Sequence, residues 1–206
     1  MRYRRLVGSL EIELECDPRF EQIAQTLLEK MEMLNLKGPA LKDGSRIQYG
    51  WSLLTLRAKN GGLMVCEPDF DGDALRDFRA NLDTTLEVLC EQTEVLRRTG
   101  LAGIDIRFSD EVFIRGGALE SPNLFLKRQV PSGARDSGWY IGTPDDLEGK
   151  ATTKPPEVIR VFELLFRRRS LLKVLTLPPD FVVNIKGEEI TSILDQSGNN
   201  LWIGKQ

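Results

Sequence analysis

Strict alternation of apolar and charged residues marks the start of the chain. Residues 10–16 read LEIELEC, in which every second side chain is apolar and the intervening ones are glutamates. This period of two predicts a strand with one buried face and one charged face. Asp17 and Pro18 follow, and an aspartate N-cap with proline at the first helical position is typical of a helix start. Apolar residues then recur at intervals of three and four from Phe20 to Leu34, which predicts an amphipathic helix.

The pattern continues with strands and one more long helix. A strand is expected near Ile47–Arg57, and Asn60–Gly61–Gly62 is typical of a hairpin turn to a returning strand at Leu63–Cys66. The longest apolar stripe at helical spacing predicts a helix from about Asp73 to Arg98. Residues Ile104–Ile114 are expected to form one or two strands. This order of elements indicates an α+β unit.

The second half of the chain begins with two short strands and a turn. Residues 121–142 read SPNLFLKRQVPSGARDSGWYIG, in which the Pro, Ser and Gly residues supply turn chemistry between two apolar runs. Pro155–Pro156 is expected to start a helix that ends at Arg167–Arg168–Arg169, where the three arginines form a solvated helix end. Strands are expected at Phe181–Ile185 and Ile190–Leu194.

These elements predict an α+β protein built of two small units. Gly116–Gly117 is the expected hinge, so that residues 1–116 form an N-terminal α+β unit and residues 117–206 form a second α+β domain. In each unit we expect a mostly antiparallel sheet with one or two packed helices.

The charge of the chain argues against a nucleic-acid partner. The 206 residues carry 28 basic and 31 acidic side chains, whereas a nucleic-acid-binding protein shows a basic excess. Residues 1–115 hold 16 of the basic and 20 of the acidic side chains, so the first half is better suited to a basic partner. No segment has the pattern of a signal peptide or the length of a membrane span. We therefore expect a cytoplasmic protein that contacts neither membrane nor nucleic acid.

The residue types used in catalysis are scarce. The chain has no histidine, which removes the commonest general base and metal ligand. Its three cysteines, Cys16, Cys66 and Cys90, form no CxxC pair and lie in apolar patterns, so we expect buried thiols in a reducing compartment. No Gly-x-Ser-x-Gly elbow is present. The sequence predicts no catalytic residue, no metal site and no cofactor, and paired carboxylates leave a hydrolase as the enzymatic alternative.

The C-terminal half nevertheless carries a recognisable set of short motifs between residues 120 and 203. With these residues the chain resembles the immunity-protein-33-like domain family of bacterial polymorphic-toxin and contact-killing systems, such as type VI secretion. The motifs are Ser121–Pro122–Asn123–Leu124, Asp136–Ser137–Gly138–Trp139, Leu177–Pro178–Pro179, Gly187–Glu188–Glu189–Ile190, Asp195 and Asn199–Asn200–Leu201–Trp202.

This resemblance implies a protein that binds a cognate toxin and blocks it by occlusion, without catalysis. If the toxin is a nuclease, its basic substrate groove would attract an acidic surface. A non-catalytic adaptor or regulatory module is the alternative. The candidate partner-binding residues are Asp69, Asp71, Asp73, Arg135, Asp136, Trp139 and Tyr140.

Each candidate also has a purely structural interpretation. Asp69, Asp71 and Asp73 have the spacing of the first ligands of a calcium loop, but Ala74 and Ala80 replace the glycine and glutamate that the loop requires. The three aspartates are otherwise a loop that caps the following helix, or an acidic patch that faces the toxin. Trp139 is typical of a core residue on an alternating strand, or else of a binding anchor. The Asp136–Ser137–Gly138 segment is typical of a turn, and Trp51 of a core residue.

Overall fold

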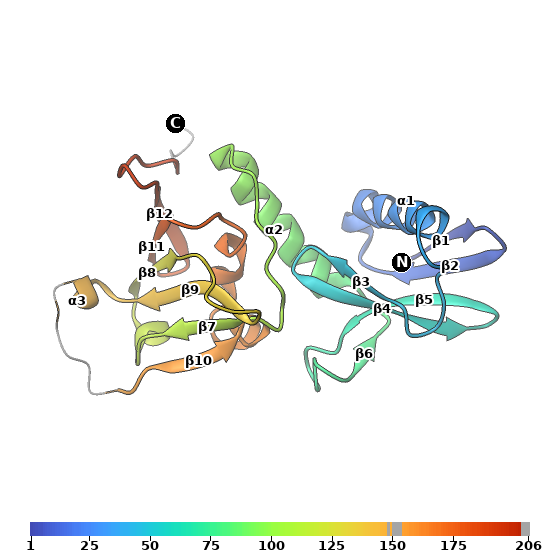
Figure 1. Cartoon of the computed structure of the whole chain (residues 1–206), viewed down its shortest axis with the longest axis horizontal. Coiled ribbons are helices and arrows are strands. Elements are labelled where there is room, and N and C mark those ends of the chain that lie inside the picture. Colours follow the sequence, from blue (N-terminus) through green and yellow to red (C-terminus); the bar gives the residue numbers. More distant parts are fainter. Residues whose placement is uncertain (148, 150–153, 203–206) are drawn as a thin grey trace. The chain divides into compact units, whose positions relative to one another are not determined.

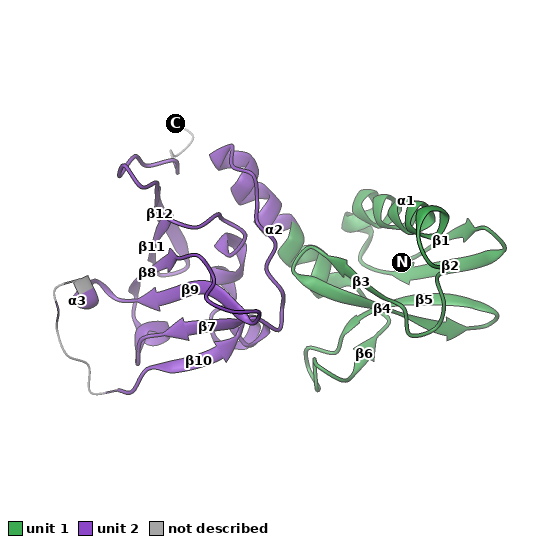
Figure 2. Cartoon of the chain, in the orientation of Figure 1, with its two compact units in different colours: residues 1–89 green, residues 90–206 purple. Residues whose placement is uncertain are grey.

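The chain folds into two compact units, residues 1–89 and 90–206 (Figures 1 and 2). The computed structural model describes residues 1–147, 149 and 154–202. Each unit contains a mixed sheet of six strands with helices, so the predicted α+β class with two small units is confirmed. Within the described residues, no helix is long and apolar enough to cross a membrane.

The first unit is a sheet covered on one face by α1 (Figure 1). Its strands run in the order β1-β2-β5-β4-β3, with β6 paired to β5, and only the β2–β5 pair in this path is parallel. The elements are β1 (Arg2–Val7), β2 (Leu10–Glu15), a 3₁₀ turn (Pro18–Phe20), α1 (Glu21–Lys37), β3 (Arg46–Tyr49), β4 (Ser52–Lys59), β5 (Gly62–Pro68) and β6 (Phe78–Arg79).

Local chemistry explains the elements that the pattern predicted correctly. Asp17 accepts a hydrogen bond from the amide of Arg19 at 2.9 Å, which starts the 3₁₀ turn that leads into α1. Asn60 and Gly61 both have positive φ, of 51° and 82°, as a two-residue hairpin between β4 and β5 requires. Trp51 is fully buried and stacks on Phe70 with ring centroids 5.2 Å apart, so its predicted core role is confirmed.

Two predicted elements of the first half differ from the structure. The single strand expected at Ile47–Arg57 is the hairpin of β3 and β4, because Gly50, with φ of 55°, turns the chain. The helix expected from Asp73 to Arg98 is shorter, and α2 spans Asp83–Thr99. Within the segment before α2, Phe78 and Arg79 instead form β6, which pairs with β5. The first backbone N–H groups of a helix have no partner within the helix. As part of β6, these two residues find their backbone partners on β5 instead.

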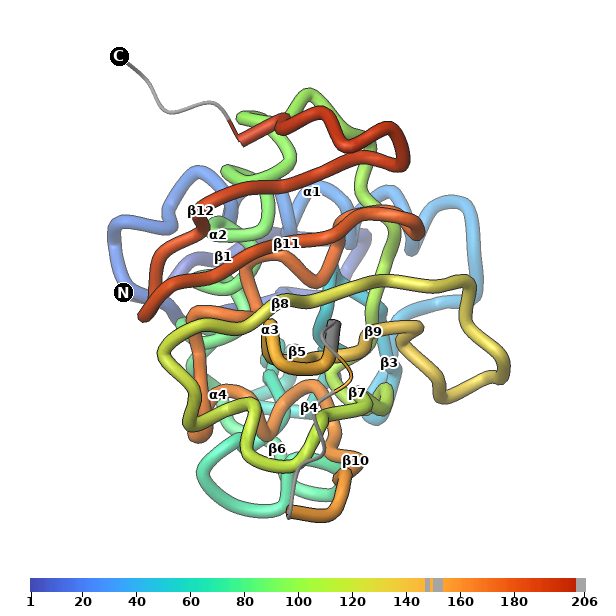
Figure 3. Tube along the Cα trace, turned by 90° about the vertical axis from the view of Figure 1, so that its left-hand side faces the viewer, coloured from blue at the N-terminus to red at the C-terminus, as the bar shows by residue number. Residues whose placement is uncertain are grey.

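The second unit is a six-stranded sheet in the order β10-β7-β9-β8-β11-β12, as Figure 3 shows from β12 to β10. Only the β7–β9 pair is parallel. The strands are β7 (Glu111–Ile114), β8 (Asn123–Arg128), β9 (Asp136–Gly142), β10 (Glu157–Arg160), β11 (Val182–Lys186) and β12 (Glu189–Leu194). Its helical segments are α3 (Pro144–Leu147), α4 (Leu164–Arg167) and 3₁₀ turns at Ala118–Glu120, Val161–Glu163 and Arg169–Val174.

The division between the units falls inside α2, between Leu89 and Cys90, and not at Gly116–Gly117. The strand β7 accounts for this difference, because it precedes the two glycines yet pairs with β9 and β10 of the second unit. A side chain would not fit at Gly116, since a Cβ there would lie 2.3 Å from the carbonyl oxygen of Pro155.

Two further predictions in the second half are wrong. The helix expected from Pro155–Pro156 is the strand β10, followed by short helical turns. Arg168, expected in a solvated helix end, is 8% exposed and donates to the carbonyl oxygens of Leu119, Ser121 and Gly187. Three carbonyl acceptors offset much of the cost of burying this guanidinium, whose Nε makes no hydrogen bond and lies 3.5 Å from a carboxylate oxygen of Glu188.

The cysteines lie mainly in the interior. Cys16 and Cys66 are buried free thiols, as predicted, and Cys90 is half-buried. Burial raises the pKa of Cys16 to about 11, so this thiol stays protonated at neutral pH and is a poor nucleophile.

Candidate partner-binding surfaces

The candidate residues of the first unit lie in one loop, residues 69–77, which we call the acidic loop. Asp71 and Asp73 are exposed and Asp69 is half-buried. The Asp69 carboxylate accepts from the amide of Asp71 at 3.3 Å, and the Asp73 carboxylate accepts from the amide of Leu75 at 3.0 Å. Asp71 forms an ion pair with Arg79. The three side chains therefore shape the loop, as in its purely structural interpretation.

The acidic loop does not gather its carboxylates as a calcium loop does. In the described part of the chain, no group of three or more His, Cys, Asp or Glu side chains is placed to hold a metal ion. The carboxylates of Asp69 and Asp73 point to backbone amides and that of Asp71 to a guanidinium, so the spacing along the sequence does not translate into convergent ligands.

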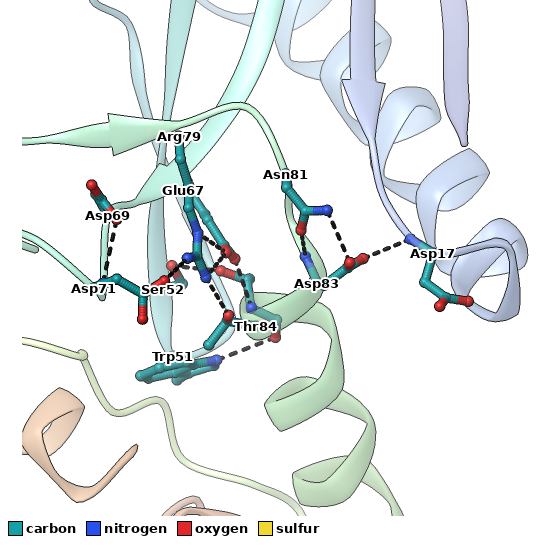
Figure 4. A network of polar contacts seen from close by, with 11 residues as sticks. Asp17, Trp51, Ser52, Glu67, Asp69, Asp71, Arg79, Asn81, Asp83 and Thr84 are labelled. Atoms are coloured by element: carbon teal, nitrogen blue, oxygen red, sulfur yellow. Dashed lines mark hydrogen bonds and ion pairs between the residues drawn. The ribbon is translucent and has the colours of Figure 1, made fainter. Parts of the chain in front are cut away.

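The acidic loop is anchored by a buried ion pair that the sequence analysis missed (Figure 4). Glu67, at the end of β5, has no exposed surface and accepts from Arg79 Nε at 2.9 Å and from the amide of Thr85 at 2.7 Å. The Thr85 hydroxyl donates to Ser52 Oγ at 3.0 Å, and its carbonyl accepts from the indole of Trp51 at 3.2 Å. Burial raises the pKa of Glu67, while its hydrogen bonds to Thr85 and Arg79 oppose that rise.

A second cluster fixes the start of α2. Asp83 accepts hydrogen bonds from the amide of Asp17 at 2.6 Å and from the side chain of Asn81 at 2.9 Å, and its own amide donates to Asn81 Oδ1 at 2.7 Å. Together with Glu67, these contacts connect β5, β6 and the first turn of α2. The sequence signal for this missed ion pair was a glutamate at the end of an apolar strand. A carboxylate that is buried in such a place needs a polar partner.

The candidate residues of the second unit begin at the turn before β9. Asp136 accepts from the amide and hydroxyl of Ser132 at 2.8 and 2.7 Å and from the amide of Gly138 at 2.7 Å. The hydrogen bond from the Ser132 amide is the main reason that the pKa of Asp136 lies below its usual range. Gly138 has φ of 75°, and a Cβ there would lie 2.1 Å from the carbonyl oxygen of Gln129. Arg135 is exposed beside this turn.

Trp139 and Tyr140 are neighbours in sequence but face opposite sides of the sheet. Trp139 is 1% exposed, and its indole donates to the carbonyl oxygen of Leu175 at 2.8 Å. It is therefore a core residue, and its assignment as a partner contact is corrected. Arg128, also buried, donates to the same carbonyl at 3.3 Å and lies 5.7 Å from the centre of the indole ring. Tyr140 is half-buried on the other side.

Tyr140 belongs to a row of apolar side chains on the outer face of the sheet. The strand register places Val158 opposite Phe113 and Phe113 opposite Tyr140. Phe113 and Val158 are each 49% exposed, and Val130, in the turn before β9, is 74% exposed. We call these four residues the Phe113 face. Part of it borders a shallow cavity of about 260 Å³ that is also lined by Asp136 and Ser132.

The fold covers only one part of this outer side. Phe125 also points outward from β8, but α3 packs over that strand and Phe125 is only 5% exposed. Arg115 forms an ion pair with Asp146 of α3, and Asp146 accepts from the amide of Thr143 at 2.7 Å, which holds α3 in place. Phe125 and Tyr140 lie with ring centroids 6.0 Å apart. The exposed Phe113 face therefore adjoins Phe125, which α3 covers.

The sequence analysis did not identify Phe113, Val130 or Val158. Phe113 lies between Val112 and Ile114, which are both buried. All three residues are apolar, so their sequence does not show which side chain points outward. The alternation of Glu111, Phe113 and Arg115 was the available signal, because it places Phe113 on a face with charged residues.

A comparison with known families identifies most of this second unit. Residues 91–196 match the family model described as the Imm33-like domain. This stretch includes every strand of the second sheet and all of the Phe113 face, and it confirms the resemblance inferred from residues 120–203. No curated protein and no solved structure matched the chain.

Proposed function

The chain belongs to the Imm33-like domain family, and from that premise we propose that it is an immunity protein. It binds a cognate bacterial toxin in a stoichiometric complex and neutralises it by occlusion. The match to residues 91–196 is the observation that carries this proposal. In this view the second unit supplies the toxin contact and no chemical step takes place on the chain.

The Phe113 face is the surface that best suits such a contact. Protein interfaces are enriched in aromatic residues at their centres, and a few such side chains supply most of the binding energy. Phe113 and Tyr140 are adjacent across two strands, and the exposed Val158 and Val130 flank them. Asp136 lines the cavity beside this face, and the exposed Arg135 precedes it in the chain. Charged groups at the edge of an interface contribute to orientation more than to affinity.

We assign the acidic loop a smaller role in attracting a basic toxin, such as a nuclease. Its exposed carboxylates act through their charge at long range, while their hydrogen bonds maintain the loop. Electrostatic attraction of this kind raises the association rate and weakens as salt increases. The buried Glu67 has no such role, because Arg79 and Thr85 occupy both of its oxygens. That occupation also speaks against Glu67 as the carboxylate of a hydrolase.

Co-expression with the neighbouring open reading frame, as the candidate toxin gene, tests the proposal. We expect the wild-type chain to restore growth of cells that express the toxin and to co-purify with it at a fixed ratio. Phe113→Ala combined with Tyr140→Ala should weaken the complex at least tenfold, which corresponds to about 1.4 kcal/mol. Isothermal titration calorimetry measures this loss.

Phe166→Ala is the matched control, because Phe166 is 61% exposed in the same unit but is not part of the Phe113 face. Protection and affinity should be unchanged in this variant. Equal losses in both variants would argue against the Phe113 face while leaving the immunity function in place. A toxic neighbour that neither binds the wild-type chain nor is neutralised by it would contradict the immunity function and favour an adaptor.

A further inference from the structure

The first unit contains a groove that the family match does not cover. The groove lies between the C-terminal end of α1, the following loop and β3, and its volume is about 520 Å³. Leu34, Pro39 and Ile47 contribute apolar surface to its lining, and Leu34 is 39% exposed. Its lining is mainly apolar, as is typical of sites that bind an extended segment or a small molecule.

Every charged residue that lines the groove is cationic, namely Lys30, Lys42 and Arg46. Lys30 Nζ lies 5.5 Å from the centre of the Tyr49 ring, and the Arg46 guanidinium lies 5.8 Å from that of Phe78. These aromatic contacts hold two of the three charges beside β3 without neutralising them.

The three cations also lack the carboxylate partners that most other cations of the first unit have. Among the described residues, none of the three lies within 4.0 Å of a carboxylate oxygen. By contrast, Arg4 and Lys59 contact Glu13 at 2.8 and 3.0 Å. The nearby carboxylate of Asp43 accepts from the amide of Ala58 at 2.8 Å. The groove therefore combines an apolar lining with uncompensated positive charge, which is complementary to an acidic, partly apolar ligand.

The strand β3 adds a backbone edge to this chemistry. It is the last strand of the order β1-β2-β5-β4-β3. Tyr49 pairs with Ser52 across a two-residue turn and Ile47 pairs with Leu54. In such a hairpin the residues that flank the turn exchange both backbone hydrogen bonds, and the pattern alternates along the strand. The amide and carbonyl groups of Arg46 and Gln48 therefore face away from β4, toward the open edge.

We propose that this groove binds an extended acidic segment of a partner protein. The segment pairs with the outward backbone groups of Arg46 and Gln48, as in other cases of strand addition to a sheet edge. Its alternate side chains meet the groove, so that an apolar one contacts Leu34 and its carboxylates meet Lys42 and Arg46. This second binding surface is separate from the toxin contact assigned to the Phe113 face, and it does not rest on the immunity function.

The test uses the full chain and a fluorescein-labelled heptapeptide, Glu-Leu-Glu-Val-Glu-Leu-Glu, in fluorescence anisotropy at 0.1 M salt. We expect saturable binding at micromolar concentrations. Lys42→Glu combined with Arg46→Glu should weaken it at least tenfold, and Leu34→Ala about threefold. The matched control is Lys127→Glu combined with Lys186→Glu, which makes the same charge change at exposed lysines of the second unit and should leave binding unchanged.

Three results would overturn the proposal. Equal losses in the groove variant and the control variant would show that only net charge attracts the peptide. Equal binding of the same peptide with alternate N-methylated amides would exclude strand addition. Dimers of the wild-type chain in sedimentation that are lost in the groove variant would assign the groove to a second copy of this chain. Circular dichroism of each variant establishes that it is folded before binding is measured.

Discussion

The acidic loop of the first unit and the Phe113 face of the second unit use their side chains differently. In the acidic loop, Asp69 and Asp73 bind backbone amides and Asp71 binds Arg79. On the Phe113 face, Phe113 and Val158 pack across neighbouring strands and each keeps 49% of its surface exposed. The fold thus employs the carboxylates of the loop internally, while it leaves apolar area on the sheet uncovered. Exposed apolar area of this kind is a stronger indication of a binding surface than a cluster of charges.

The neighbours Trp139 and Tyr140 provide the sharpest test of this comparison. Trp139→Ala removes a core indole and its hydrogen bond to Leu175, and should lower the free energy of unfolding by about 3–5 kcal/mol. Tyr140→Ala should lower it by only about 1 kcal/mol, because its ring is half-buried. Urea denaturation followed by circular dichroism measures both values. Similar losses in the two variants would contradict the assignment of Trp139 to the core and of Tyr140 to the surface.

Glu67 and Asp71 allow the same comparison within the first unit, since both pair with Arg79. Glu67→Gln removes the buried charge and should cost about 3 kcal/mol, because Arg79 loses the partner for which it is partly buried. Asp71→Asn changes the exposed member of the pair and should cost less than about 1 kcal/mol. Thermal and urea unfolding of both variants check this order. If Asp71→Asn were the more damaging change, the buried ion pair would not be the anchor of the acidic loop.

Asp136 connects the turn before β9 to the pH dependence of stability. Its pKa in the folded state is lowered, first by the hydrogen bond from the Ser132 amide. Its contribution to stability is therefore fully present above the unfolded value of about 3.9, and is lost as pH falls through the folded pKa. Asp136→Asn should destabilise the protein by about 1 kcal/mol at pH 7. The difference in free energy of unfolding between the Asp136→Asn variant and the wild type should shrink toward pH 2.

Denaturant midpoints between pH 2 and pH 7 measure this dependence. Asp105→Asn is the matched control, because Asp105 is an exposed aspartate of the same unit. A difference between wild type and Asp136→Asn that stays constant across this range would show that the carboxylate charge at Asp136 does not contribute to the turn.

The periodic elements could be predicted from the sequence because their signals are local. The alternation at residues 10–16, the Asp17 cap and the Asn60–Gly61 turn each act within a few residues. The start of α2 and the strand β10 could not be predicted in this way. They depend on partners distant in sequence, since β6 pairs with β5 and β10 pairs with β7.

The candidate surfaces show the same limit. Sequence reasoning proposed Tyr140 and Trp139 together, because it did not determine which of the two faces the core. It missed Phe113 and Val158, whose exposure follows from the register of β7 and β10 and from the position of α3 over β8. The buried pair of Glu67 and Arg79 was also missed, since it joins residues on two strands whose pairing had not been predicted.

The smallest expected effect concerns the charge of the acidic loop. Replacement of Asp69, Asp71 and Asp73 by asparagine removes three charges but keeps a side-chain oxygen for the hydrogen bonds within the loop. Under the proposed function, this triple variant should associate with a basic toxin about threefold more slowly at low salt, with an unchanged dissociation rate. Surface plasmon resonance at several salt concentrations measures both rates.

The dependence on salt separates a charge effect from damage to the loop. Charge at an exposed loop acts over about a Debye length, which is near 10 Å at 0.1 M salt and 3 Å at 1 M. The threefold difference should therefore vanish at high salt. A variant with Asp105, Glu188 and Glu189 neutralised in the second unit carries the same net charge and is the control. Under the proposed function the Phe113 face supplies the short-range contacts. A triple loop variant that dissociates faster at every salt concentration would instead place part of the binding surface on the acidic loop itself.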